Sequence, residues 1–405
     1  MRVLLVGSGG REHALAWRIA SSPALTDLHA APGNPGIATL ATCHPIAADD
    51  ADGLLGLARS LAIDLVVVGP EAPLVAGVAD TLRHAGISVF GPSAAAARIE
   101  GSKRFAKEVM AAAGVPTAAL LDVPRAPCVV KADGLAAGKG VLVCRTNVEL
   151  EAGLDAAREF HGAVLVEELL EGSELSILAV CDGAGALPLA PARDFKRAYD
   201  GDEGPNTGGM GSFAPVPGID GHALSGLLET CIQPVLDELA LRGTPFVGTL
   251  FAGLMLTADG PRVLEYNCRF GDPETQSVLP LVEGDLLGAL AAAASGSLGA
   301  ISLGRVEGAA VTVVLAAGDY PEASDRGTPI DGVADAEATG ALVFQAGTAL
   351  HDGRLVTNGG RLLGVTATGP TVAAARGRAY AAADLVRIPG ARRREDIALA
   401  AAAAA

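Results

Sequence analysis

Short apolar segments alternate with helix-like segments over the first hundred residues. Three apolar runs are each followed directly by glycine: Val3–Val6, Leu65–Val68 and Ile87–Phe90. Between them, Glu12–Ser21 and Leu74–Ala85 carry apolar residues at helical spacing. Continuous apolar strands are typical of a parallel sheet that helices cover on both faces. The pattern predicts a doubly wound α/β domain whose ligand site lies at the carboxyl ends of its strands.

The rest of the chain predicts mixed α/β structure. A helix is expected from about Ser102 to Ala113, and Gly114 ends it. From Cys128 to about Val180 the pattern is strand, glycine loop, strand, helix, strand. Residues 186–217 are dense in glycine, proline and charge, which predicts a long functional loop. The last part predicts strands at Val311–Ala316, Leu342–Gln345 and Leu362–Thr366, turns at His351–Gly353 and Asn358–Gly360, and a helix over Val372–Val386.

Composition excludes several classes of protein. The 405 residues are too many for one core, so two to four domains are expected. A net charge of −16 argues against a nucleic-acid binder, which needs a basic surface. No membrane span and no signal peptide are expected. The six cysteines lack CxxC spacing, which favours a reducing compartment over a disulfide or zinc framework. A cytoplasmic protein is predicted, with a monomer as its expected state.

Three glycine-containing loops end strands of the predicted N-terminal sheet. They are Gly7–Gly10, Gly33–Gly36 and Gly69–Glu71. The first one opens a helix, where backbone N–H groups favour an anion. A dinucleotide fingerprint needs glycine where Glu12 stands, so nicotinamide binding is disfavoured. A tight turn without a ligand remains the alternative for this loop alone, but three polar loops at one edge favour a small-molecule site.

The segment Lys131–Val141 is a second glycine-rich element, placed between two predicted strands. It is not a Walker A loop, because Gly140 rather than serine or threonine follows Lys139. A strand–loop–strand flap can cover nucleotide phosphates, with Lys131 directing a cation at them. The alternative is a flexible hairpin with solvated lysines.

Two further segments can be interpreted either as ligand-binding or as structure without a ligand. After the strand Ala163–Val166, the run Glu167–Gly172 can offer backbone groups to an adenine edge, and Glu174 can accept ribose hydroxyls; a solvated acidic face is the alternative. The segments Arg193–Arg197 and Gly204–Gly211 concentrate cations and glycines as a ligand-binding loop would. A disordered linker is the alternative, which the aromatic residues disfavour.

The segment Leu264–Glu274 carries the most specific pattern. Glu265 and Asn267 alternate on a predicted strand and therefore point to the same face. A carboxylate and an amide oxygen, completed by nucleotide phosphates, suit Mg²⁺. Arg269 continues the alternation and can clamp a carboxylate or phosphate. The alternative is a buried salt-bridge network.

Together these segments resemble the phosphoribosylamine–glycine ligases of the ATP-grasp superfamily. The matching segments occur in order at Gly9–Ala14, Gly69–Leu74, Lys131–Gly140, Gly204–Gly211, Glu265–Thr275 and Val356–Arg361. The resemblance implies an α/β protein with a Rossmann-like substrate domain at 1–101, a two-part ATP-grasp at 102–320 with a small lobe at about 118–183, and a small α+β domain at 321–405. After Ile397 the chain departs from the family, because it becomes almost all alanine.

The resemblance also implies a reaction. ATP would phosphorylate the glycine carboxylate, and the amine of 5-phosphoribosylamine would attack the glycyl phosphate, giving glycinamide ribonucleotide, ADP and phosphate for purine biosynthesis. The implied ATP-binding residues are Lys103, Lys131, Gly138, Lys139, Gly140, Glu167, Leu169 and Glu174. The implied catalytic residues are Asp194, Lys196 and Arg269, and the implied ligands of Mg²⁺ or Mn²⁺ are Glu265 and Asn267. The implied substrate-binding residues are Gly9, Gly10, Asn34, Glu71, Gly271 and Asp272.

Two other functions remain open at this point. One is an ATP-grasp ligase that joins a different acid and amine, in which the N-terminal loops would differ. The other is a nucleotide-binding sensor without catalysis, which the presence of Lys131 and of the Glu265–Asn267 pair disfavours.

Overall fold

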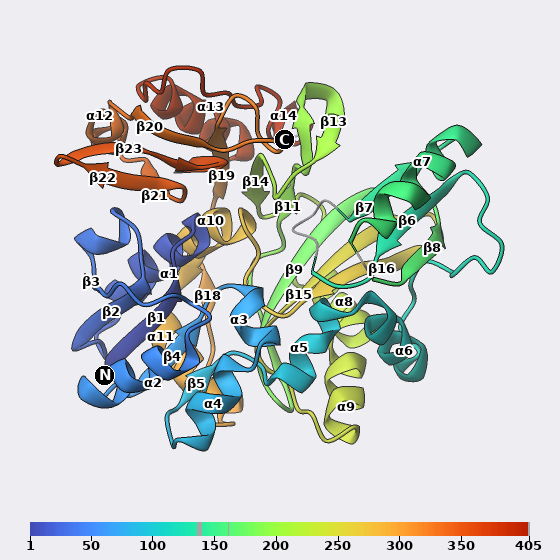
Figure 1. Ribbon diagram of the computed structural model, residues 1–405, viewed down its shortest axis with the longest axis horizontal. Helices are drawn as coiled ribbons and strands as arrows, with labels where there is room; N and C mark the ends of the chain where they lie inside the picture. The colour runs from blue at the N-terminus through green and yellow to red at the C-terminus, as the bar shows by residue number, and fades with distance from the viewer. Residues whose placement is uncertain (136–139, 161, 404–405) are drawn as a thin grey trace.

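A computed structural model describes residues 1–135, 140–160 and 162–403. Its N-terminal part is a parallel sheet in the order β3-β2-β1-β4-β5 (Figure 1). The strands are β1 (Arg2–Gly7), β2 (Asp27–Pro32), β3 (Thr42–Cys43), β4 (Leu65–Val68) and β5 (Val89–Phe90). Val3 to Val6 are fully buried, as expected for strands covered on both faces. The predicted doubly wound sheet is confirmed, although its last strand is shorter than predicted.

The helices of this part are α1 (Gly10–Ala20), α2 (Ala51–Ser60), α3 (Glu71–Val75), α4 (Val78–His84) and α5 (Ala94–Gly101). The prediction of one helix over Leu74–Ala85 is wrong. Gly77 adopts a left-handed conformation, with φ at +90°, and separates α3 from α4. Helical spacing of apolar residues continues across this break, which is why the sequence pattern did not show it.

The next part begins with α6 (Lys103–Ala113), which Ser102 caps and left-handed Gly114 ends, as predicted. A small lobe follows, with strands β6 (Cys128–Ala132), β7 (Val141–Cys144) and β8 (Val164–Glu168) and helix α7 (Asn147–Arg158). It projects on one side of the molecule in Figure 1. The lobe has a separate small core, made by Cys128, Val130, Ala132, Cys144, Leu150, Ala157 and Val166. Of the predicted ATP-binding residues, Gly138 and Lys139 lie outside the described residues.

The central sheet runs β10-β9-β15-β16 and is antiparallel. Its strands are β9 (Ser173–Asp182), β10 (Ala186–Pro188), β15 (Val247–Thr257) and β16 (Gly260–Asn267), with helices α8 (Gly221–Cys231) and α9 (Gln233–Leu241) beside it in Figure 1. Helices α10 (Glu274–Val278) and α11 (Leu286–Ala294) follow, and strands β17 (Val282–Glu283) and β18 (Gly304–Arg305) pair with each other.

The prediction of one long loop over residues 186–217 is wrong. Besides β10, the segment forms β11 (Arg193–Asp194), β12 (Arg197–Tyr199), β13 (Glu203–Asn206) and β14 (Gly211–Ala214). β14 pairs with β19 (Ala309–Ala316), about a hundred residues further along the chain. β11 to β14 are two to four residues long, and β14 pairs with a strand distant in the chain, so glycine and proline content dominated the sequence pattern.

The C-terminal part adds β20 (Asp325–Pro329), α12 (Val333–Ala338), β21 (Leu342–Gln345), β22 (Thr348–His351), β23 (Arg354–Gly359), β24 (Arg361–Gly369), α13 (Val372–Ala383) and α14 (Leu399–Ala403). The predicted turn at His351–Gly353 joins β22 to β23, with Asp352 and Gly353 left-handed. One sheet, in the order β11-β14-β19-β24-β21, contains strands from both sides of residue 320. In the described ranges, no helix combines the length and apolarity that a bilayer crossing requires.

Candidate functional site

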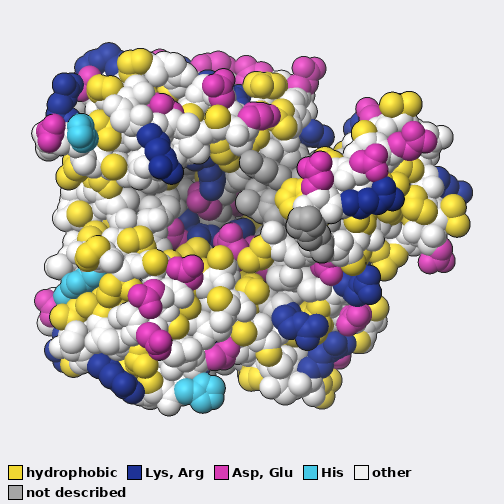
Figure 2. Space-filling model, in the orientation of Figure 1, with side chains coloured by type: hydrophobic (Ala, Val, Ile, Leu, Met, Phe, Trp, Pro, Cys, Tyr) yellow, Lys and Arg dark blue, Asp and Glu magenta, His cyan; other side chains and the backbone are white. Residues whose placement is uncertain are grey.

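A cavity of about 1140 Å³ lies where the helices of the N-terminal part, the small lobe, the central sheet and the C-terminal part meet. Figure 2 shows a hollow in the middle of the molecule in which Lys or Arg and Asp or Glu side chains gather. Many predicted site residues line the cavity: Glu71, Lys103, Lys131, Gly140, Glu167, Leu169, Glu174, Asp194, Lys196, Glu265, Asn267, Arg269 and Asp272. Residues far apart in sequence therefore share one charged cavity, as a ligand site requires.

Four predicted substrate residues do not line this cavity. Gly9 and Gly10 begin α1, and Gly271 packs closely over the Glu274 carboxylate. Asn34 is buried, and its Nδ2 donates hydrogen bonds to Ser8 O at 2.7 Å and to Gln345 O at 2.8 Å. Its described contacts thus join the β2 loop to the first glycine loop and to β21. Their roles toward a substrate stay predictions.

A lysine cluster forms one side of the cavity, around the carboxylate of Glu167. Lys131 Nζ lies 2.7 Å from Glu167 Oε2 and also donates to Leu264 O at 2.9 Å. Lys107 Nζ lies 3.1 Å from Glu167 Oε1. All three side chains are at least nine-tenths buried. Burial lowers the pKa of Lys107, and Glu167 counteracts that shift. The predicted role of Glu167 concerned its backbone; the structure adds a side-chain role, as the shared counter-ion of two lysines.

Lys103 joins this cluster from the first turn of α6. Its Nζ donates to Gly134 O at 2.9 Å, and its backbone N–H donates to Asp133 Oδ1 at 2.6 Å. Burial lowers the Lys103 pKa, while the charge of Glu265 opposes the shift and that of Lys131 adds to it. The ammonium groups of Lys103 and Lys131 carry charges of the same sign and repel each other. The negative charge of a polyphosphate bound in the cavity would offset this repulsion.

Glu265 and Asn267 stand on β16 at the cavity wall, opposite Gly253 and Phe251 of β15. A register shift in β15 follows Gly253, where only a hydrogen atom occupies the side-chain position facing Glu265. The donor atoms are oxygens, which fit a hard divalent cation. No cluster of three or more His, Cys, Asp or Glu side chains suited to a metal occurs in the described ranges. A cation held by Glu265 and Asn267 therefore needs further oxygen ligands from a bound molecule.

The end of β11 and the loop after it carry a pair of opposite charges, the buried Asp194 and the partly exposed Lys196. Lys196 Nζ lies 2.8 Å from Glu174 Oε2 and 3.5 Å from Asp194 Oδ1. Burial alone lowers the pKa of Lys196, but Asp194, Glu174 and Glu265 raise it well above its usual value. Burial raises the pKa of Asp194, and Lys196 opposes this. The Asp194 side chain is 6% exposed, and its Oδ1 accepts no hydrogen bond from the described residues, so it is available to a ligand.

Glu274 is a site residue that sequence reasoning missed as a chemical group. It lines the cavity and is only 3% exposed, and Ser176 Oγ donates to its Oε1 at 3.3 Å. Burial and the nearby Asp194 charge raise the pKa of Glu274 to about 8. It is therefore protonated at neutral pH, as a carboxyl group among other carboxylates in a dry site should be.

An arginine network forms the opposite side of the cavity. Arg269 Nε lies 3.2 Å from Glu71 Oε2, and its Nη2 lies 3.2 Å from Glu100 Oε1. Arg11 Nη1 lies 3.6 Å from the same Glu71 oxygen. Burial raises the pKa of Glu71, but Arg269 and Arg11 outweigh it and lower the pKa to about 2. Glu71 is thus an anion that joins the N-terminal domain to the loop after β16.

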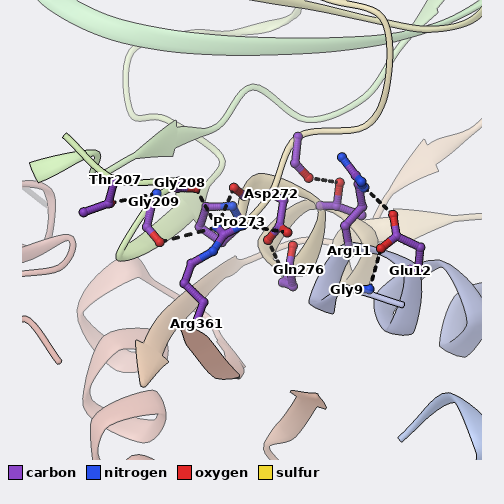
Figure 3. Close-up of polar contacts among 12 residues, drawn as sticks. Gly9, Arg11, Glu12, Thr207, Gly208, Gly209, Asp272, Pro273, Gln276 and Arg361 are labelled. Carbon is purple, nitrogen blue, oxygen red and sulfur yellow. Dashed lines mark hydrogen bonds and ion pairs between the residues drawn. The ribbon is translucent and has the colours of Figure 1, made fainter. Parts of the chain in front are cut away.

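The first glycine loop is occupied by a carboxylate of its own chain. Glu12 Oε2 accepts a hydrogen bond from the Gly9 backbone N–H at 2.7 Å, and Glu12 Oε1 lies 2.5 Å from Arg11 Nε (Figure 3). Gly7 and Gly69 pack so closely on Glu12 that a side chain at either position would collide with it. The Gly9 N–H is therefore bonded to Glu12 in this structure.

Arg361, at the start of β24, ties three segments together (Figure 3). Its Nη2 donates to Asp272 Oδ2 at 2.8 Å and its Nη1 to Gly208 O at 2.5 Å. Gln276 Nε2 donates to Asp272 Oδ1 at 2.7 Å. Burial raises the pKa of Asp272, but Arg361 and Arg11 lower it below its usual value. Gly209, with φ at +106°, packs against Pro273 where no side chain fits. The glycine loop 204–211 is thus ordered against the site.

The comparisons with known proteins agree with this geometry. Residues 1–100, 101–275 and 310–400 match the N, ATP-grasp (A) and C domains of phosphoribosylglycinamide synthetase. The phosphoribosylamine–glycine ligase of Streptomyces coelicolor is 50% identical to this chain over the whole of both chains. The chain belongs to the phosphoribosylamine–glycine ligase family. The ligase of Mesorhizobium japonicum is also 50% identical, over 98% of this chain and 97% of that protein.

Solved structures support the same family assignment. The crystal structure of the Thermotoga maritima phosphoribosylamine–glycine ligase is 36% identical, with a TM-score of 0.85, covering 98% of this chain and 100% of that one. The biotin carboxylase domain of Hydrogenobacter thermophilus 2-oxoglutarate carboxylase, at 17% identity and a TM-score of 0.69, shows the shared fold only. The resemblance inferred from the sequence is therefore confirmed, together with its fold class.

Proposed function

We propose that this protein ligates glycine to 5-phosphoribosylamine with ATP, through a glycyl phosphate, for purine biosynthesis. The observation that carries the proposal is the single cavity in which a lysine cluster, an oxygen pair for a cation and the Asp194–Lys196 pair meet. Full-length relatives named as this ligase support it. A cytoplasmic monomer that uses Mg²⁺ or Mn²⁺ is part of the proposal.

The lysine cluster would bind the nucleotide. Lys103 and Lys131 lie at the base of the small lobe, where their ammonium groups can meet phosphate oxygens. Leu169 follows β8 and would present backbone groups to adenine, and Glu174 would accept ribose hydroxyls after leaving Lys196. Glu265 and Asn267 would hold a divalent cation, which supplies positive charge to the phosphates when bound. Gly140, next to the strand that carries Lys131, would cover the phosphates of the nucleotide. Gly138 and Lys139 are proposed to act together with Gly140.

Glycine is a zwitterion, and the end of β11 and the loop after it offer both signs of charge. Asp194 would accept the glycine ammonium group, while Lys196 and Arg269 would face its carboxylate and then the acyl phosphate. A glycine carboxylate oxygen attacks the terminal phosphorus of ATP, and ADP leaves. The phosphoribosylamine nitrogen then attacks the acyl carbon, and phosphate leaves with the glycine oxygen. Positive charge around the transferring group stabilises both steps.

The second substrate would enter from the N-terminal side. Glu71 and Asp272 line the cavity there and carry negative charge that can accept ribose hydroxyls. The ribose phosphate would be held at the side of the cavity next to Glu71 and Asp272. The residues proposed to hold it are Gly9, Gly10, Asn34 and Gly271. The Gly9 N–H is bonded to Glu12, so a phosphate at this loop would have to displace that carboxylate or use neighbouring N–H groups.

The test is the substrate dependence of phosphate release by the purified protein. Release should require glycine, a divalent cation and freshly made phosphoribosylamine together with ATP. The control replaces glycine with alanine or serine, whose side chains the buried Asp194 pocket should exclude. Equal turnover with those amino acids would indicate a different ligase, and ATP binding without turnover in any mixture would indicate a sensor.

A further inference from the structure

One buried arginine is not explained by the proposed reaction. Arg394 follows α13 in a segment of the C-terminal part, residues 392–398, that we name the C-terminal strap. Its side chain is 1% exposed and is the largest of the fully buried side chains. Buried arginines are rare unless they are paired, so its surroundings show what it holds in place.

Arg394 uses all three of its nitrogens. Nε donates to Asp396 Oδ1 at 2.7 Å and Nη2 donates to Asp396 Oδ2 at 2.6 Å, which is a bidentate pair within the strap. Nη1 donates to Asp202 Oδ1 at 2.8 Å and to Arg197 O at 3.1 Å, both in the β12–β13 hairpin. A bidentate pair fixes the orientation of the guanidinium as well as its position. The strap and the hairpin are therefore joined through one rigid group.

The same guanidinium packs on Phe195, the residue between Asp194 and Lys196. Its Cζ lies 5.1 Å from the centre of the Phe195 ring, within the range of a cation–π contact. Phe195 is also fixed through its backbone, since its N–H donates to Gly211 O at 3.0 Å and its O accepts from Met210 N at 2.7 Å. Asp194 and Lys196 approach each other to 3.5 Å. Arg394 thus contacts the middle residue of the segment that presents this pair.

Other contacts of the strap reinforce the arrangement. Asp396 Oδ2 accepts from the Gly201 N–H at 2.9 Å, and the Glu395 N–H donates to Asp200 Oδ1 at 2.8 Å. Arg394, Asp396 and the first residues of α14 line the same cavity as Asp194 and Lys196. In Figure 1 α14 lies beside β13. The strap is therefore part of the cavity wall.

We propose that Arg394 is a positioning residue for glycine: from the C-terminal strap it holds Phe195, and through it sets the placement of Asp194 and Lys196. The inference rests on the proposed function, because it assigns glycine to the Asp194–Lys196 pair. The proposed phosphate-binding residues of the ATP site, Lys103 and Lys131, are not among the contacts of Arg394. The two substrates should therefore respond differently to its loss.

The experiment measures the KM for glycine and for ATP in Arg394→Ala, Arg394→Lys and a control, Arg393→Ala. Arg393 is the adjacent residue, and its guanidinium pairs with Asp384 and Glu395 rather than with the hairpin. Arg394→Ala should raise the glycine KM about 10- to 100-fold, the scale of misplacing a reacting group, and change the ATP KM less than twofold. Arg394→Lys should recover only part of the loss, because lysine cannot form the bidentate pair.

Phe195→Leu provides a second test if Arg394→Ala does not fold. Leucine keeps an apolar side chain but removes the ring under the guanidinium, so the glycine KM should rise again while the ATP KM stays unchanged. Equal changes in both KM values, or a glycine KM like that of Arg393→Ala, would overturn the positioning role. Wild-type protein that does not turn over glycine at all would instead overturn the proposed function, so the two failures are distinguishable.

Discussion

The two sides of the cavity use different cations. On the side proposed for the nucleotide, Lys107 and Lys131 share one carboxylate, that of Glu167, and the Lys103 ammonium group donates to a backbone carbonyl. On the side proposed for the second substrate, Arg11, Arg269 and Arg361 each contact a carboxylate and a backbone carbonyl. Lysine is a compact charge on a flexible stem, suited to following phosphates that move during transfer. Arginine fixes geometry with a planar fork. The contrast indicates that the lysine side can adjust to a moving ligand, whereas the arginine side is rigid.

The largest expected effect is at Glu265, which lies between the two sides. Glu265→Ala removes the carboxylate that would hold the divalent cation, so turnover should fall by about 10³-fold or more while the fold stays intact. Steady-state phosphate release and circular dichroism measure the two properties. Glu283→Ala, at an exposed carboxylate of β17, is the control and should keep the wild-type rate. A wild-type rate in Glu265→Ala would refute the metal role.

The arginine side should be sensitive to geometry rather than to charge. Arg269→Lys keeps the positive charge but cannot contact Glu71 and Glu100 together, so kcat should fall about 100-fold. Arg262→Lys is the matched control, since Arg262 is partly exposed and lies 3.9 Å from Glu168. Its rate should stay within twofold of wild type. If Arg269→Lys were equally active, fixed geometry on this side would not matter.

The lysine side should be sensitive to charge balance. Lys107→Met leaves the buried Glu167 with one cation instead of two. The ATP KM should rise about tenfold and the free energy of unfolding should fall by about 3 kcal/mol, because breaking a buried ion pair leaves a charge uncompensated. Arg104→Met, on the exposed face of the same helix, is the control. An increase in the glycine KM without one in the ATP KM would contradict the division of the cavity into two sides.

The effect expected to be smallest on activity concerns Glu274, through the pH dependence of stability. Its folded-state pKa of about 8 lies above the usual value of 4.5, so the folded state binds more protons between these values. Its contribution is fully present below about pH 4.5 and is lost as the pH rises toward 8, with a slope of at most about 1.4 kcal/mol per pH unit. Glu274→Gln should remove this slope, as urea unfolding at several pH values would show. Parallel wild-type and variant curves would contradict the raised pKa.

Local patterns predicted those parts of the molecule whose partners are near in sequence or buried on both faces. The apolar runs that became β1 and β4 and the caps of α6 are examples. The strands β11 to β13 were missed because each is only two to four residues long, and β14 was missed because it pairs with β19, far along the chain. Pairings of that kind leave no periodic signal in a segment rich in glycine and proline.

The site residues likewise divide into those that the sequence could predict and those that depend on tertiary packing. Glu265, Asn267 and Lys131 could be predicted because strand alternation and a distinctive string placed them. Lys107, Glu100 and Arg394 could not, because each is a single charged residue in an ordinary helix or in the C-terminal segment. Only tertiary packing brings them to Glu167, Arg269 and Phe195. Arg361 is the last residue of Val356–Arg361, one of the segments that resemble the family. Its contacts with Asp272 and Gly208 nevertheless depend on the folded chain.

The transfer of oxygen from glycine to phosphate tests the central claim most directly. The protein is incubated with ATP, a divalent cation, freshly made phosphoribosylamine and glycine labelled with ¹⁸O in its carboxylate, and the phosphate is analysed by mass spectrometry. A glycyl phosphate requires that each phosphate released carries one glycine oxygen, with one ADP and one glycinamide ribonucleotide formed per phosphate. Unlabelled phosphate, or labelled phosphate without the ribonucleotide, would contradict the account.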